Sequence, residues 1–296
     1  MRVFLALAAA SFISPAAPAS AAAVPPMAPL IVPPDGAVQV TVNGQKSRML
    51  LLGDGSSIPV FNAAAAQQFG FKPAWISFSI RIATVKIKGW TAVVRYDVNG
   101  QPYRRRTVWF EREIAPGFAG MLGPGAAPQN VVTVQIRPPA ANERPFVLPL
   151  VENRVLGVGT MSGKIFVQFD PLRRQTMGTA AAGALLAESQ GGALTGATRP
   201  APIRFGVERP VRTLAFARPL KLGPIELRSV AIRVFDYGSI AKIPDADADP
   251  EEIVAIGKKK KDPDYRSLHI AADALAGCSS ITFDKLRKQI ILSCQA

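Results

Sequence analysis

The chain of 296 residues has little of the chemistry that many enzymes rely on, with one histidine and two cysteines. A zinc site built from histidine and cysteine needs about four such ligands, so we expect no metal, and no motif indicates a cofactor. A hydroxyl nucleophile such as Ser56 or Ser57 needs a neighbouring base. The single histidine, His269, begins a predicted strand, where a packed or surface side chain is expected. Gly120 to Gly125 lacks the Lys-Ser/Thr ending of a phosphate loop.

Long apolar runs are also absent after the N-terminus, so no later segment is expected to span a membrane. Residues 1–21 are typical of a secretory signal, with Arg2, an apolar stretch from Val3 to Ile13, and an Ala-x-Ala cleavage site ending at Ala21. A membrane anchor is the alternative, but this stretch is short for a span. Residues 22–35 form a Pro/Ala-rich leader that we expect to be disordered. The sequence therefore predicts a periplasmic or secreted protein.

Acidic residues are the scarcer charged class, 21 against 35 basic residues, which gives a formal net charge of +14. Such a balance favours anionic partners, among them acidic proteins, nucleic acid and an anionic membrane surface. The basic residues are spread along the chain and accompany no nucleic-acid-binding motif, so we expect no nucleic acid partner. An anionic membrane surface stays a candidate. Residues 239–266 are predicted to form a charged surface insertion, acidic and then basic.

The two cysteines are predicted to form a disulfide. Two short apolar stretches, Ser280 to Phe283 and Gln289 to Leu292, are typical of strands around a turn. A hairpin folded symmetrically about Leu286 places Cys278 opposite Cys294, and cross-strand partners approach to disulfide distance. An oxidising compartment favours the bond.

The segment around which the chain is organised runs from Arg48 to Phe71. Asn43-Gly44 predicts a tight hairpin turn, because both residues tolerate positive φ, and an apolar strand returns from it. That strand breaks into the loop Gly53-Asp54-Gly55-Ser56-Ser57. A short helix is then expected over Ala63 to Gln68, with Asn62 before it and Gly70 closing it.

This order resembles the active-site segment of retropepsin-like aspartic proteases. Val60-Phe61-Asn62 and Phe69-Gly70-Phe71 match the later part of the family's pattern, and Gly55-Ser56-Ser57 matches its Gly-Ser-Ser. The family's catalytic Asp falls on Gly53, and its Thr falls on Asp54. The resemblance thus implies Asp54 as a catalytic residue displaced by one position, with Gly55, Ser56 and Ser57 in contact with substrate.

A second pass of the same order follows at an offset of 117 residues. Lys164 to Phe169 is an apolar strand that ends at Asp170, and an Ala-rich helix follows over Ala180 to Ser189. The resemblance implies a mainly β fold of two tandem β-barrel lobes with short helices, residues 36–150 and 151–296, and a cleft between them. It places a flap over this cleft at the hairpin around Asn99-Gly100. Two lobes in one chain favour a monomer.

Aspartic proteases need two carboxylates that share one proton, which implies Asp54 and Asp170 as the pair. Both loops depart from the family, because Pro171 has no N–H and Leu172 cannot adopt glycine conformations. The sequence therefore leaves two hypotheses, an exported aspartic endopeptidase or a catalytically inactive relative that binds peptide or protein in the periplasm. A structural envelope protein is a third.

The role of Asp170 has an alternative explanation. Phe169-Asp170-x-Leu172-Arg173 mirrors Phe283-Asp284-x-Leu286-Arg287 in the cysteine hairpin. On this reading Asp170 is the turn residue of a hairpin that closes the first lobe, and it has no catalytic role. The helix predicted directly after Asp170 favours the first interpretation, since the later copy ends with no helix.

Overall fold

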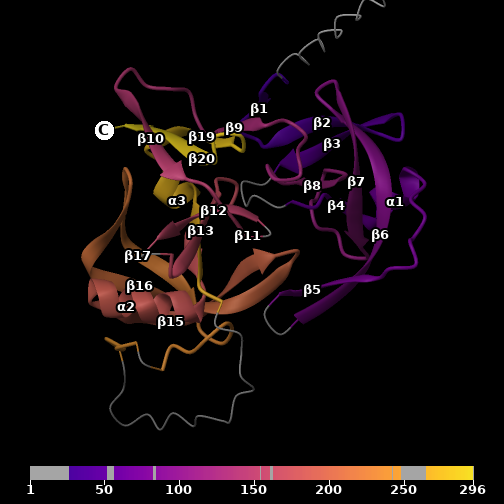
Figure 1. Cartoon of the computed structure of the whole chain (residues 1–296). Helices are drawn as coiled ribbons and strands as arrows, with labels where there is room; N and C mark the ends of the chain where they lie inside the picture. Colours follow the sequence, from indigo (N-terminus) through magenta and orange to yellow (C-terminus); the bar gives the residue numbers. More distant parts are fainter. Residues whose placement is uncertain are drawn as a thin grey trace, which may run out of the picture.

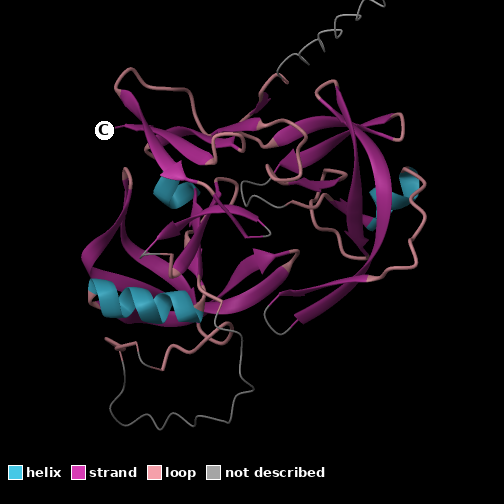
Figure 2. Ribbon diagram, in the orientation of Figure 1, coloured by secondary structure: helices cyan, strands magenta, loops and turns pink. Residues whose placement is uncertain are grey.

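Strands dominate the fold, and three sheets contain every strand of the described residues (Figures 1 and 2). We call residues 27–150 the first half and residues 151–295 the second half. Residues 1–26, which include the predicted signal, lie outside the described residues. The computed structural model describes residues 27–51, 57–82, 85–153, 155–160, 163–241, 243–247 and 265–295.

The first half is a seven-stranded sheet of which six strands close into a barrel, because β2 pairs with both β3 and β6. Its predicted turns are confirmed: Asn43 and Gly44 have φ of 48° and 83°, and Asn99 and Gly100 have φ of 52° and 76°. The strand order is β2-β3-β8-β4-β7-β6-β5. The strands are β2 (Ala37–Val42), β3 (Gln45–Leu51), β4 (Val60–Asn62), β5 (Phe78–Ile82), β6 (Val85–Val98), β7 (Gln101–Phe110) and β8 (Gly120–Leu122).

The second half is an eight-stranded sheet with the order β11-β12-β13-β18-β14-β17-β16-β15. The helix α2 (Ala180–Gln190) lies along one face of its long strands (Figure 2). The strands are β11 (Val151–Asn153), β12 (Val155–Thr160), β13 (Ile165–Asp170), β14 (Met177–Gly178), β15 (Gly192–Arg204), β16 (Val207–Leu222), β17 (Ile225–Arg233) and β18 (Ser267–Ala271).

The two halves repeat one pairing pattern. In the first half β8 is parallel to β3 and antiparallel to β4, and β4 is parallel to β7. In the second half β18 is parallel to β13 and antiparallel to β14, and β14 is parallel to β17. A helix follows the short strand in both, α1 (Ala63–Gln68) after β4 and α2 after β14. The predicted second pass of strand, loop and helix is therefore present.

Close packing at the crossing of the short strands uses one glycine in each half. Gly120 pairs with Phe61, and a Cβ on Gly120 would lie 2.1 Å from the carbonyl oxygen of Val60. In the second half the equivalent pair is Leu268 with Gly178. The glycine of the pair is therefore on β8 in the first half and on β14 in the second. In each pair the other residue provides the side chain that fills the core.

Both predicted helices are confirmed, but their N-termini differ. Thr179 caps α2 with its hydroxyl, which accepts a hydrogen bond from the N–H of Ala182 at 3.2 Å, and Gly191 ends the helix in the left-handed conformation. Asn62 precedes α1 without capping it. Its buried amide instead accepts from the N–H of Ile114 at 2.7 Å and donates to the carbonyl of Phe118 at 2.8 Å. Asn62 therefore fixes the loop before β8.

A five-stranded sheet joins the two halves, with the order β1-β9-β19-β20-β10. Leu30 and Val32 of its first strand are buried, so the disorder expected for the leader is wrong for this part. The short helix α3 (Ala272–Leu275) precedes β19. The strands are β1 (Leu30–Val32), β9 (Val131–Gln135), β10 (Glu143–Pro149), β19 (Cys278–Asp284) and β20 (Gln289–Gln295).

The predicted disulfide between Cys278 and Cys294 is present in this sheet. Asp284 pairs with Gln289, so most of the hairpin is centred between Leu286 and Arg287. The predicted centre is Leu286 itself. A bulge between Cys278 and Ser280 then shifts the register and brings the two cysteines opposite each other.

The hydrophobic core is continuous through both halves, with one large cluster that includes Phe61, Val132, Phe169 and Phe283. Within the described residues, no helix is both long enough and apolar enough to cross a bilayer. The predicted charged insertion is anchored at its start, where Arg212 donates to the carboxylate of Asp245 at 2.7 Å. Residues 248–264 of this insertion lie outside the described residues.

The disulfide should matter for stability because it closes a loop with a sequence separation of 16. We expect Cys294→Ser to lower the free energy of unfolding by about 3 kcal/mol, chiefly by freeing the unfolded chain. Urea unfolding of the pure protein measures this. Cys278→Ser should give the same loss, and the double variant no further loss. Equal midpoints for the oxidised wild type and Cys294→Ser would contradict the prediction.

Candidate functional site

A cavity of about 690 Å³ lies between the two halves. The first half contributes the end of β3, the hairpin strand β5, and β8. The second half contributes the end of β13 with the turn after it, the tip of the β15–β16 hairpin, and β18. The lining includes Leu50, Ile80, Arg81, Ile82, Met121, Gln168, Asp170, Leu172, Arg173, Arg174, Arg199, Ile203, Arg204, Phe205, Arg233, Tyr237 and His269.

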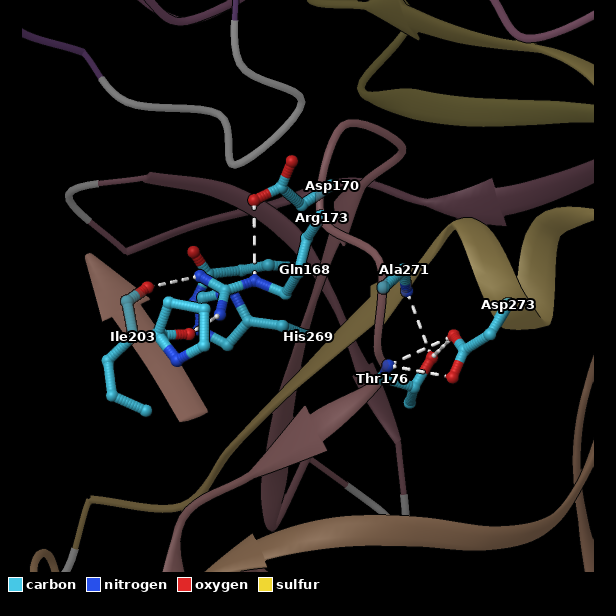
Figure 3. A network of polar contacts seen from close by, with 9 residues as sticks. Gln168, Asp170, Arg173, Thr176, Ile203, His269, Ala271 and Asp273 are labelled. Atoms are coloured by element: carbon cyan, nitrogen blue, oxygen red, sulfur yellow. Dashed lines mark hydrogen bonds and ion pairs between the residues drawn. The ribbon is translucent and has the colours of Figure 1, made fainter. Parts of the chain in front are cut away.

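Asp170 is the last residue of β13, and it is a buried carboxylate at this cavity. Its Oδ2 lies 3.5 Å from Nε of Arg173, three residues later in the turn. The same guanidinium donates to the carbonyl oxygens of Pro202 at 3.2 Å and Ile203 at 2.5 Å on β15 (Figure 3). Arg173 therefore ties the carboxylate to the neighbouring hairpin.

A second polar contact holds the other end of this turn. The backbone N–H of Thr176 donates to both carboxylate oxygens of Asp273, at 2.9 and 3.0 Å, and its hydroxyl donates to the same group at 2.6 Å. That hydroxyl also accepts from the N–H of Ala271 at 3.0 Å (Figure 3). The turn after Asp170 is thus pinned to β18 and α3, which sets the position of Arg173.

Two of the predicted site residues, Ser57 and Asp170, lie in the part of the chain that the structure describes. Asp170 lines the cavity, as does Leu172 beside it. Ser57 is half-buried and is not among the lining residues. Asp54, Gly55 and Ser56 lie outside the described residues. Their predicted roles therefore stay predictions.

The strand pairing tests the explanation of Asp170 as the turn residue of a hairpin. β13 pairs with β12 and β18, and the chain continues through β14 into α2, so Asp170 does not turn a hairpin. The alternative explanation is wrong in this respect, although the local likeness is real. Asp284 makes the same contact with the arginine three residues on, Oδ2 to Nη1 of Arg287 at 3.4 Å.

The strand register also refines the alignment of the two halves. Leu51 pairs with Leu122 in the first half as Phe169 pairs with Ile270 in the second. After the loop that follows these strands, Val60 and Met177 are equivalent. The difference in residue number between equivalent positions is therefore one larger before this loop than after it. The loop of the first half is longer by one residue.

The predicted flap is wrong in its position. The turn Asn99-Gly100 between β6 and β7 is not among the lining residues, whereas Ile80, Arg81 and Ile82 of the β5–β6 hairpin are. The hairpin β15–β16 of the second half reaches the cavity from the opposite side with residues 201–206. The edge strands of the two large sheets, β5 and β15, therefore both contribute to the lining of the cavity.

The tip of the β15–β16 hairpin is fixed to the first half by Phe205. Its ring is buried and lies 5.5 Å from the ring of Phe110, and its carbonyl accepts from Nη1 of Arg112 at 3.3 Å. Phe205 has a φ of 54°, a left-handed conformation that is unfavourable for a bulky residue. A second contact joins the halves nearby, where the hydroxyl of Tyr237 donates to the carbonyl of Arg81 at 3.3 Å.

Sequence reasoning missed the feature that dominates the cavity, which is a set of arginines. They come from four separate segments, namely β5, the turn after β13, β15 and β17, so no motif links them. The net charge of the whole chain was the single signal in the sequence. Asp170 is the one acidic residue in the described lining. The six arginines are Arg81, Arg173, Arg174, Arg199, Arg204 and Arg233.

His269 lies on β18 opposite Gln168 of β13, and Nε2 of the two side chains are 3.4 Å apart. Burial and the positive charges of Arg173, Arg233 and Arg204 lower the pKa of His269 well below its usual range. The imidazole is therefore neutral at pH 7, and Nδ1 has no hydrogen-bond partner within the described part of the chain. No three His, Cys, Asp or Glu side chains of that part gather into a metal site.

Comparison with known proteins gives limited information about this chain. No family model matches it, and no curated protein does. Among solved structures, EIAV protease in complex with the inhibitor HBY-793 is similar to part of it, at 16% identity over 29% of this chain and 79% of that chain, with a TM-score of 0.23. A likeness this partial carries no argument about function.

Phe205 should hold the hairpin tip against the first half. We expect Phe205→Gly to release the tip, because the loss of the ring contact with Phe110 outweighs the relief of backbone strain, roughly 3 kcal/mol against about 1 kcal/mol. Hydrogen exchange of residues 199–207 should then become faster. Asn43→Gly, at another turn with positive φ, is the matched control and should leave that exchange unchanged. Unaltered exchange in Phe205→Gly would exclude the anchoring role.

His269 should make stability depend on pH in a defined direction. The folded protein keeps the imidazole neutral where the unfolded chain binds a proton, so unfolding takes up a proton below about pH 6.5 and acid favours it. We expect the free energy of unfolding to fall by up to about 1.4 kcal/mol per pH unit between pH 6.5 and 5.5. Since the chain has no other histidine, His269→Gln should remove this slope. Urea unfolding at several pH values compares the two proteins, and parallel profiles would refute the assignment.

Proposed function

We propose that the two halves are lobes of the aspartic-protease type and that the protein binds an extended peptide between them without cleaving it. The observation that carries the proposal is the repeated pairing pattern with a cavity where the two copies meet. The carboxyl end of β13 and the end of β3 both reach that cavity. This is the arrangement that the sequence resemblance implies for a single-chain protein of two lobes.

The state of Asp170 argues against hydrolysis. A shared-proton pair requires two carboxylates in close contact. The carboxylate of Asp170 is already engaged by the guanidinium of Arg173, with Oδ2 and Nε 3.5 Å apart. Pro171 directly after it provides no N–H to orient an acidic pair. The inactive alternative is therefore better supported than the endopeptidase.

The edges of the two large sheets support an extended ligand. β5 ends the seven-stranded sheet and β15 ends the eight-stranded one, and both reach the cavity. An edge strand can accept an extended peptide as a further strand. Pro200 and Pro202 deprive β15 of N–H donors in the stretch that lines the cavity. We therefore place the added strand against β5, at Phe78–Ile82.

Export, a monomeric state and attraction to an anionic membrane surface are part of this proposal as predictions from the sequence. A peptide-binding protein outside the cytoplasm would meet extended segments of unfolded or secreted chains.

Cleavage can be tested directly with denatured casein between about pH 3 and 7, the range in which a carboxylate pair is active. We expect no cleavage by folded wild-type protein. Asp170→Asn and Asp54→Asn are the paired variants. Acid-range cleavage by the wild type that both substitutions abolish would overturn the proposal and establish an endopeptidase with Asp54 and Asp170 as its pair.

Binding can be tested by calorimetry with a capped peptide of about nine residues, in which valine and isoleucine flank a central glutamate. We expect binding that weakens by about tenfold or more when alternate backbone nitrogens are methylated, because strand addition depends on main-chain hydrogen bonds. Equal affinity for the methylated peptide would exclude strand addition. Failure of both peptides to bind would overturn the peptide-binding function.

A further inference from the structure

We propose that an exposed face of β6 and β7 docks on an anionic phospholipid surface, with Trp75 inserted among the lipid headgroups. This inference rests on the attraction to an anionic membrane in the proposed function, not on peptide binding, and it names the residues that carry the attraction. The described lining of the cavity includes none of them. We call these residues the Trp75 surface: Trp75, Ile76, Val93, Arg95, Arg104 and Arg106.

Trp75 is the most exposed large apolar side chain of the described residues, with 94% of its surface accessible to water. Ile76 beside it is 41% exposed. The indole combines an apolar ring with one N–H donor, so tryptophan favours the boundary between water and hydrocarbon in a membrane. A side chain that protrudes this far fits a fluid headgroup layer, which can enclose it without a pocket of matching shape.

The exposure of Trp75 is imposed by the backbone on both sides of it. The N–H of Ala74 donates to the carbonyl of Thr91 at 2.8 Å, and the hydroxyl of Thr91 donates to the carbonyl of Ile76 at 3.0 Å. Thr91 is itself buried within β6. The residues around Trp75 are therefore already fixed, so its insertion costs little conformational entropy of the chain.

Thr91 also joins this loop to the arginines of β7. Its Oγ1 accepts from Nη1 of Arg106 at 3.1 Å. Arg106 pairs with Val93, which is 46% exposed, and Arg104 pairs with Arg95. Cross-strand partners lie on the same face of a sheet, as do residues two apart along a strand. The three arginines and Val93 therefore share one face, next to the loop that carries the exposed tryptophan.

The pair of Arg95 and Arg104 is unfavourable in the protein alone. Both side chains are exposed, and like charges directly opposite each other on neighbouring strands repel. Residues 93–106 include four basic side chains and one acidic, Asp97, whose Oδ1 accepts from the N–H of Gly100 at 2.8 Å. Lipid phosphates accept hydrogen bonds from guanidiniums and attract basic residues near the membrane. Contact with an anionic surface would therefore offset the repulsion between the two arginines.

Sedimentation of the full chain with vesicles tests the proposal. We expect binding to vesicles of phosphatidylglycerol and phosphatidylcholine in equal parts, weakened by sodium chloride, and much weaker binding to phosphatidylcholine alone. Trp75→Ala should weaken binding by about tenfold, as expected for a large apolar side chain that leaves water. Arg95→Gln should weaken it by about fivefold, the contribution of one basic residue near an anionic surface.

Leu286→Ala and Arg228→Gln are the matched controls. Leu286 is 71% exposed in the turn of the cysteine hairpin, and the side chain of Arg228 is 79% exposed on β17. Each control removes the same kind of group from another surface and should keep the wild-type affinity. Arg95→Gln removes one of two opposed like charges, so it should fold at least as stably as wild type. Circular dichroism verifies the folding of each variant.

Tryptophan fluorescence reports insertion directly. The chain has three tryptophans, of which Trp90 is half-buried and Trp109 is buried. We expect a blue shift of the emission on addition of the anionic vesicles, because Trp75 leaves water. Trp75→Phe should lose this shift while it keeps most of the binding, since the phenyl ring is also apolar.

The outcomes separate this surface from the attraction on which it rests. If wild type binds anionic vesicles but Trp75→Ala and Arg95→Gln bind no more weakly than the two controls, the Trp75 surface is overturned and the membrane attraction stands. A wild type that binds no anionic vesicles overturns both, and peptide calorimetry still decides peptide binding separately. Equal binding to both kinds of vesicle overturns the role of the arginines. A blue shift that persists in Trp75→Phe overturns the insertion of Trp75.

Discussion

The parallel pairing of β13 with β18 is the constraint on which the cavity depends. It sets Gln168 opposite His269 and Asp170 opposite Ala271, while β14 pairs with the other edge of β18. Thr176 then joins the turn after Asp170 to Asp273 and Ala271. Gln168, Asp170 and His269 are thus positioned by backbone pairing between distant segments.

The same pairing in the first half holds different side chains. Leu50 and Met121 take the places of Gln168 and His269, and Gly120 takes the place of Leu268. A duplicated framework can therefore present an apolar wall and a charged wall to one ligand.

The hairpins determine how open the cavity is. Phe205 crosses from the second half into the apolar cluster of the first, and Tyr237 reaches Arg81. The strained φ of Phe205 is tolerated because the ring is buried against Phe110. The two contacts join the halves beside the cavity, which the edge strands β5 and β15 both line.

The sequence by itself determined the local elements and their duplication, namely the Asn-Gly turns, the helices after Asn62 and Thr179, the two strand-loop-helix passes, and the cysteine pair. These follow from short-range backbone preferences and from alternation of apolar residues. It placed the flap on the wrong hairpin, because Asn99-Gly100 gives a strong turn signal and the connection between β5 and β6 contains no such pair. Only the tertiary structure decided that Asp170 faces Arg173 and that six arginines from four segments gather at one cavity. Long-range strand pairing creates those contacts, and no periodicity along the chain encodes which distant side chains will meet.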